Sequence, residues 1–193
     1  MFKNYTLFAA VAALSISSAA LAEGAPVSAF ASYDGEKVAS SKDVISEASL
    51  GLSTSVLGVG VDGVAVAATK NFSAAKNSVG FEAGLSHALP TMYGFQTSAR
   101  VAYGRRYEDG AVGFNYYSGE VDVKRPITSD IALIGGYRYR NSFGGSNDFR
   151  SNRVEGGLEL GLSKHWTTDV LYTHTEGTNL TGNGAVVKLA YKF

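Results

Sequence analysis

Apolar residues alternate with polar or very small residues along most of this chain, and a period of two is typical of β-strands with one apolar face. The clearest segment is 93–104, where Tyr93, Phe95 and Val101 lie at alternate positions among glycine, glutamine, serine and arginine. The same alternation occurs at 79–86, 154–162 and 184–193. After residue 22 no segment repeats apolar residues at helical spacing. The chain is therefore expected to be all-β.

The segment 1–22 has the pattern of a secretory signal peptide. Lys3 makes the start positive, residues 7–16 (LFAAVAALSI) are apolar, and Ala20-Leu21-Ala22 is a small-residue cleavage pattern. The apolar stretch is shorter than the roughly 20 residues of a transmembrane helix, which favours a signal peptide over an anchor. We expect cleavage before Glu23 and a single domain over 23–193. Since the chain has no cysteine, its stability after export must come from burial and backbone pairing.

Turn signals divide the rest of the chain into about ten strands, with eight as the alternative count. The signals are Asp62-Gly63, Leu89-Pro90-Thr91, Glu108-Asp109-Gly110, Arg125-Pro126 and Ser163-Lys164-His165. The expected strands are 27–33, 45–57, 64–71, 78–89, 93–105, 111–124, 130–140, 152–163, 166–174 and 183–193. Many reach the roughly 9–11 residues with which a tilted strand crosses a membrane, whereas an ordinary strand has about 5–6.

The composition of the two strand faces favours a membrane barrel over a soluble sandwich. The polar face is mostly Gly, Ser, Ala and Thr with few charges, which suits a narrow interior. The apolar face ends in aromatic residues that would form interfacial girdles: Tyr93, Tyr103, Tyr137, Tyr139, Trp166, Tyr172 and Tyr191. Because lipid requires every backbone group to be paired, we expect a closed antiparallel transmembrane β-barrel. Lys+Arg and Asp+Glu both total 17, which argues against a nucleic-acid partner.

The final strand, Val187-Lys188-Leu189-Ala190-Tyr191-Lys192-Phe193, alternates and ends on an aromatic residue. Together with the signal peptide, the all-strand chain and the absence of cysteine, it resembles the small outer-membrane β-barrel proteins of Gram-negative bacteria. That resemblance implies a monomeric structural or porin-like barrel in contact with outer-membrane lipid and lipopolysaccharide. It also implies that the barrel-assembly machinery reads Leu189, Tyr191 and Phe193.

The even strand number places both termini on one side of the membrane, which is expected to be the periplasm. The turns at Asp62-Gly63, Pro90, Pro126 and Lys164 would then be periplasmic. The connections at 34–44, 72–77, 106–110, 141–151 and 175–182 would be extracellular, and they are longer on average, as in such barrels.

One strand phase sends apolar residues to lipid and charged residues to the lumen. The expected lipid-facing residues are Val79, Val101, Tyr137, Leu158, Val170 and Leu189. The expected lumen charges are Glu82, Arg100, Arg138, Glu155, Glu159, Asp169 and Lys188. Glu120, Asp122 and Lys124 join them if a bulge near Tyr117 reverses the phase of Phe114 and Tyr116. Opposite charges at similar depth, such as Arg138 and Glu155, are expected to pair and close the lumen. A water-filled pore lined by the same charges is the alternative.

The sequence contains little that indicates catalysis. His174-Thr175-Glu176 could lie near Ser142 and Ser146 at the outer rim, as in a barrel that hydrolyses lipid A acyl chains. The His-x-Ser-Asn run of the lipid A deacylase family is absent, however, because Glu176 and Gly177 follow. We therefore expect a non-enzymatic protein with no catalytic residue, metal or cofactor, and keep the lipid-A-modifying hydrolase as the alternative. In the loop 141–151, Phe143 and Phe149 either contact a partner or pack on the rim.

Overall fold

The computed structural model describes residues 26–39, 44–56, 58–71, 76–108, 113–143, 149–178 and 180–193. The expected signal peptide lies outside these residues. The strands are β1 (Val27–Val38), β2 (Val44–Val56), β3 (Val59–Asn71), β4 (Lys76–Met92), β5 (Phe95–Glu108), β6 (Phe114–Pro126), β7 (Ile131–Ser142), β8 (Arg150–Gly161), β9 (Trp166–Gly177) and β10 (Leu180–Lys192). No helix in this part of the chain is long and apolar enough to span a bilayer.

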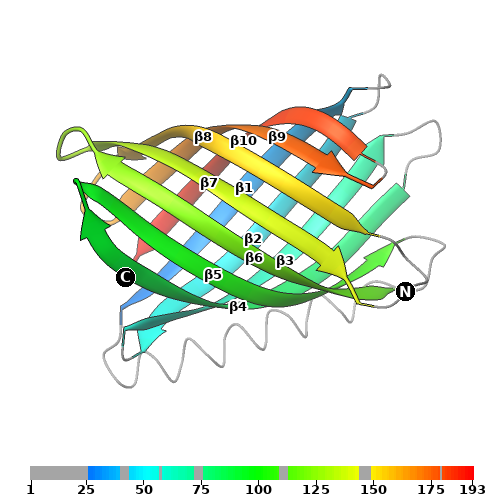
Figure 1. The fold of residues 1–193 in the computed structure, drawn as a ribbon, viewed down its shortest axis with the longest axis horizontal. Coiled ribbons are helices and arrows are strands. Elements are labelled where there is room, and N and C mark those ends of the chain that lie inside the picture. Colours follow the sequence, from blue (N-terminus) through cyan, green and yellow to red (C-terminus); the bar gives the residue numbers. More distant parts are fainter. Residues whose placement is uncertain are drawn as a thin grey trace.

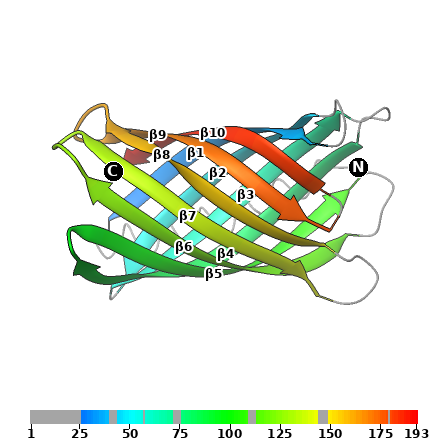
Figure 2. The same ribbon diagram turned by 45° about the horizontal axis from the view of Figure 1, so that its top comes forward.

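The ten strands form one closed antiparallel barrel, in which each strand pairs with its neighbours in the chain and β1 pairs with β10 (Figures 1 and 2). The expected ten-strand barrel is confirmed, and the eight-strand alternative is wrong. The two ends of the barrel sequence meet, because the backbone N–H of Phe193 donates to the carbonyl of Val27 at 3.0 Å. This end also carries the connections 57–58, 93–94, 127–130 and 162–165, and we call it the short-turn end. The opposite end, with the other five connections, is the loop end.

Two predicted turns are wrong because their residues continue a strand. Asp62-Gly63 lies inside β3, and the chain turns instead just before that strand, where Gly58 has φ of 80°. Leu89-Pro90-Thr91 lies inside β4, and the turn is at Tyr93-Gly94, with φ of 53° and 80°. Pro90 is tolerated there because the β4–β5 register shifts between Leu89 and Met92, so no regular ladder hydrogen bond is lost.

The other two predicted periplasmic turns agree better with the strand ends. Pro126 is the last residue of β6, and the residues between β8 and β9 include Ser163, Lys164 and His165. At the loop end the strands run further than predicted, so that 34–38, 106–108 and 175–177 belong to β1, β5 and β9. The strand register therefore determines which side chains of these extensions face the lumen and which face outward.

The outer face has the phase that the sequence predicts. Leu158 pairs with Leu133 of β7 and Val170 of β9, and all three are exposed on the barrel exterior. The same face continues through Val187 to Tyr33. Other exposed apolar residues of this face are Leu50, Leu85, Val101, Tyr103, Tyr137, Tyr172 and Leu189. The apolar exterior is the surface that lipid would cover.

The bulge predicted near Tyr117 is wrong. The β5–β6 register runs without a shift from Arg106–Phe114 to Gln96–Lys124. Phe114 and Tyr116 therefore face the lumen with the charged residues of β6. Glycine makes this possible, since a Cβ on Gly104 would lie 2.3 Å from Cζ of Tyr116. The ring occupies the space that a larger residue would fill.

Candidate functional site: a charged lumen

Every strand contributes at least one charged side chain to the inner face of the barrel. Their inward orientation follows from the registers, because residues paired across strands share a face. The inward carboxylates are Asp34, Glu36, Glu47, Asp62, Glu82, Glu120, Asp122, Glu155, Glu159 and Asp169. The inward cations in the strand interiors are Arg100, Arg106, Lys124, Arg138, Arg140, Arg153 and Lys188. The described strands thus enclose a polar interior in which carboxylates outnumber lysines and arginines.

Cross-barrel ion pairs span the loop-end half of the lumen. Arg106 Nη2 donates to Glu47 Oε2 at 3.0 Å, Arg140 Nη2 to Glu82 Oε2 at 3.3 Å, and Arg153 Nη1 to Asp34 Oδ2 at 2.5 Å. We call these six residues the ion-pair layer. The side chains of Glu82 and Arg153 are only 4% and 7% exposed. The other four side chains are 10–18% exposed, so the layer is largely buried.

Aromatic rings cover the ion-pair layer toward the loops. Phe114 lies 5.3 Å from Phe149 and 6.4 Å from Tyr116 between ring centroids. The guanidinium of Arg140 lies 5.4 Å from the Tyr116 ring centroid, a cation–π distance. Beside them, the Thr175 hydroxyl donates to Glu36 at 3.2 Å, and Thr173 is fully buried. Packed rings and paired charges thus lie together in this half of the lumen.

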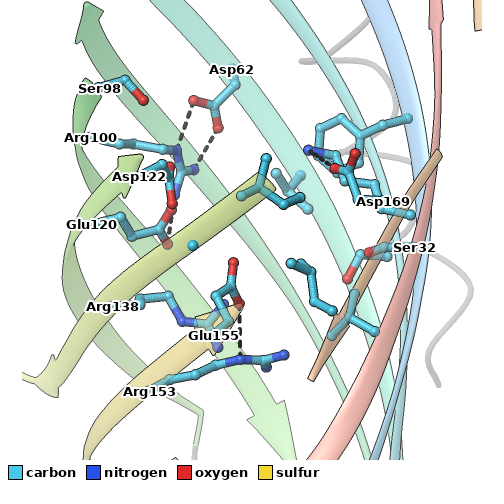
Figure 3. A pocket seen from close by; sticks show the side chains of 18 of the residues that line it. Ser32, Asp62, Ser98, Arg100, Glu120, Asp122, Arg138, Arg153, Glu155 and Asp169 are labelled. Carbon is cyan, nitrogen blue, oxygen red and sulfur yellow. Dashed lines mark hydrogen bonds and ion pairs between the residues drawn. The ribbon is translucent and has the colours of Figure 1, made fainter. Parts of the chain in front are cut away.

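Arg100 joins four strands below the layer (Figure 3). Its Nε and Nη2 donate to the two carboxylate oxygens of Asp62 at 2.9 and 2.5 Å, a bidentate contact. Its Nη1 donates to Glu82 at 2.6 Å and lies 3.2 Å from Glu120. One guanidinium thus connects β5 to β3, β4 and β6.

The short-turn half of the lumen contains a cavity of about 620 Å³, which we call the vestibule. Lys124 donates to Glu159 at 2.5 Å, and Lys188 Nζ lies 3.9 Å from Asp169 and 4.9 Å from the Phe30 ring centroid. The two lysine side chains are 37% and 40% exposed. They are the most exposed of the paired lumen side chains, whereas the six side chains of the ion-pair layer are 4–18% exposed.

The seven charges named from the sequence all lie on strands that direct them inward. Arg100 meets Glu82, Glu159 meets Lys124, and Asp169 faces Lys188. Arg138 and Glu155 are not joined to each other. Instead, Glu155 Oε2 lies 3.3 Å from Arg153 Nε, and Arg138 takes part in none of the ion pairs between described residues.

Several lumen residues were not identified from the sequence. Arg106, Arg140 and Arg153 lie in the same strand phase as Arg100, Arg138 and Glu155, so extending the period of two would have found them. Asp34 and Asp62 were assigned to a loop and a turn. No local signal indicates that their partners are Arg153 and Arg100.

The rim histidine does not meet the rim serine. His174 is on the outward phase of β9, where Nδ1 lies 2.8 Å from Asn183 Oδ1 and Nε2 lies 3.4 Å from Glu176. Ser142 pairs with Tyr116 on the lumen phase of β7. Ser146 lies outside the described residues. No group of His, Asp or Glu in the described ranges could hold a metal ion.

The two loop phenylalanines pack against the barrel on opposite faces. Phe143 lies 5.1 Å from Tyr117 and 5.9 Å from Tyr103 between ring centroids on the outside. Phe149 packs on Phe114 over the lumen. These contacts favour the rim-packing interpretation of both residues.

Comparison with solved structures gives the same architecture. The translocator domain of the autotransporter NalP from Neisseria meningitidis has a TM-score of 0.54 at 10% identity, covering 97% of this chain and 98% of that one. The beta domain of the Bordetella autotransporter BrkA has a TM-score of 0.58 at 7% identity, covering 88% and 99%. At these identities the likeness shows the fold alone, which is that of outer-membrane β-barrels. No family model matches the sequence, and no curated protein matches it.

Proposed function

We propose that this outer-membrane β-barrel is a non-enzymatic, porin-like protein that is closed to free diffusion in its resting state. The observation that carries the proposal is the ion-pair layer, three cross-barrel ion pairs in the loop-end half of the lumen whose six side chains are 4–18% exposed. A buried ion-pair network is costly to open, because each separated partner would remain unpaired in a poorly hydrated interior. Lys124 and Lys188, the most exposed charged residues of the vestibule, lie toward the short-turn end, so we infer that solvent reaches the vestibule from that end. With both termini in the periplasm, the vestibule would face the periplasm.

In planar bilayers the unmodified protein is expected to be silent. Arg140→Ala should produce a measurable leak, because it removes both the partner of Glu82 and the cation stacked on Tyr116. Glu159→Ala is the matched control, since Glu159 lies in the vestibule and its loss leaves the ion-pair layer intact. Folding is verified beforehand by faster gel migration of the unheated sample. A steady, large conductance from the unmodified barrel would contradict the proposed closure.

The absence of catalysis is part of the same proposal. His174 and Ser142 lie on opposite faces of the wall, so the hydrogen bond that an acyl hydrolase requires between base and nucleophile cannot form between them. Incubation of the purified barrel with lipopolysaccharide should release no acyl chain detectable by mass spectrometry. Release that is lost in His174→Ala would favour the hydrolase.

The C-terminal strand carries the proposed assembly signal. Leu189, Tyr191 and Phe193 follow one another on the outer face, with the Tyr191 and Phe193 rings 4.9 Å apart in a T-shaped contact. Phe193 is 65% exposed at the short-turn end and is accessible to the barrel-assembly machinery. The aromatic residues at both ends would contact outer-membrane lipid and lipopolysaccharide. A monomer suffices for this arrangement.

Deleting Phe193, or replacing it with Asp, is expected to reduce the amount of folded barrel in the outer membrane several-fold. Tyr93→Asp is the control, because Tyr93 is an exposed aromatic residue at the same end and Asp tolerates its positive φ. Outer-membrane fractions are compared by heat-shift gels. Undiminished insertion of both Phe193 variants would exclude an assembly role for this residue.

A further inference from the structure

The roof of the vestibule contains guanidinium groups that are incompletely paired. Arg138, Arg140 and Arg153 all line the cavity. Nε of Arg138 and Nε of Arg140 are buried and have no hydrogen-bond partner. The whole Arg140 side chain is only 10% exposed, so water does not replace that partner. Leaving a buried charged donor unsatisfied is unfavourable. Arg138 lines the cavity and takes part in none of the ion pairs between described residues, so its guanidinium group can accept an anionic group from the cavity side.

Two carboxylates lie directly below Arg138 and are close to each other. A Cβ on Gly136 would lie 2.6 Å from Asp122 Oδ1 and 3.4 Å from Glu155 Oε1, so both groups flank this glycine. Asp122 makes no hydrogen bond or ion pair with any other described residue, and its side chain is exposed to the vestibule. A cation beside two neighbouring carboxylates offsets their mutual repulsion and favours their charged forms. Figure 3 shows Asp122, Glu155 and Arg138 around the same space.

The residue that would bind an anionic group and the residue that would bind a cationic group are adjacent. Asp122 is paired with Gly136, and Arg138 is two residues further along β7. Arg138 is thus a diagonal neighbour of Asp122, and such positions have Cα atoms about 7–8 Å apart. Both side chains point into the lumen, so their charged groups can contact one small molecule that carries both charges.

We propose that the vestibule binds a small zwitterion of the amino-acid or short-peptide class, with its carboxylate on Arg138 and its ammonium group on Asp122 and Glu155. An anion without an ammonium group would be repelled by the cavity wall as a whole, because its lining residues include nine carboxylates and six lysines or arginines. A cation without a carboxylate would leave the roof guanidinium groups unsatisfied. A zwitterion provides an ammonium group for the carboxylates and a carboxylate for the guanidinium group of Arg138.

The size and lining of the vestibule suit such a ligand. A volume of about 620 Å³ lies within the range of small-molecule sites, roughly 300–1,000 Å³. Hydroxyl groups of Ser32, Ser49 and Ser98 line the cavity and can pair with a peptide group. The ligand enters from the short-turn end. Binding therefore does not depend on whether the ion-pair layer opens.

The test measures binding of glycylglycine to the folded barrel in detergent by calorimetry. Two analogues change one charge each: N-acetylglycylglycine lacks the ammonium group, and glycylglycinamide lacks the carboxylate. Both are expected to bind about tenfold or more weakly than glycylglycine, because each loses one set of charge-assisted hydrogen bonds. This comparison uses the unmodified protein and does not depend on the folding of variants.

Variants then locate the site. Arg138→Gln and Asp122→Asn should each weaken glycylglycine binding about tenfold or more, while Arg125→Gln, on the outer face, should not change it. The proposal is supported if glycylglycine binds saturably, if both analogues bind more weakly, and if both variants bind glycylglycine more weakly. No saturable binding, or equal binding of glycylglycine and either analogue, overturns it. Because closure is measured separately by conductance, a conducting barrel that binds the dipeptide would contradict only the proposed function.

Discussion

Replacing Arg100 with alanine is expected to lower the free energy of unfolding by about 3–5 kcal/mol, the cost of removing one partner from a buried ion pair. The substitution leaves Asp62 and Glu120 without their cation and removes one of the two cations that contact Glu82. Water that reaches the site from the vestibule would place the loss at the lower end of this range, although the Arg100 side chain is only 14% exposed.

Two further variants separate the charge of Arg100 from its geometry. Arg100→Lys keeps the charge but cannot make the two parallel hydrogen bonds to Asp62, so an intermediate loss is expected. Arg125→Ala removes an arginine from the outer rim, where it lies over Phe95, and should cost little. Denaturant titrations of the refolded barrel can follow Trp166, the single tryptophan of the chain. If Arg100→Ala and Arg125→Ala unfolded at the same denaturant concentration, Arg100 would not stabilise the barrel as the ion pairs imply.

Leu158→Arg should destabilise the barrel in lipid by roughly 2–4 kcal/mol, the cost of an arginine near the bilayer midplane. Leu158 is the central residue of an exposed apolar row with Leu133 and Val170. Leu162→Arg makes the same chemical change at the short-turn end, where the cost near an interface is about 0–1 kcal/mol. Refolding into lipid vesicles compares the two. Equal stability of the two variants would mean that Leu158 does not face the membrane core.

The strand count and the strand phase could be predicted from the sequence because alternation is a local signal. A period of two in 154–162 is sufficient to place Leu158 outside and Glu159 inside, whatever the partner strands are. The turns were harder. Asp62-Gly63 is a strong local turn signal, yet Asp62 is held in β3 by an arginine 38 residues away. The long-range ion pair outweighs the local preference.

Pairing within the lumen could not be predicted for the same reason. Which cation meets which carboxylate depends on the relative depth of strands that are distant in the sequence, and an error of two residues at one turn changes the partners. Arg138 illustrates this. Its phase was predicted, but its expected contact with Glu155 is replaced by one between Glu155 and Arg153.

The ion pairs of the layer connect strands that are not neighbours in the sheet. Arg153 of β8 reaches Asp34 of β1, Arg140 of β7 reaches Glu82 of β4, and Arg106 of β5 reaches Glu47 of β2. Each pair spans the cross-section as a chord, whereas backbone hydrogen bonds act only along the circumference. A ring braced by chords resists being flattened into an ellipse. The loop end should therefore keep a round cross-section under the lateral pressure of the bilayer. The short-turn end, where the described residues form no ion pair across so many strands, is the more deformable of the two.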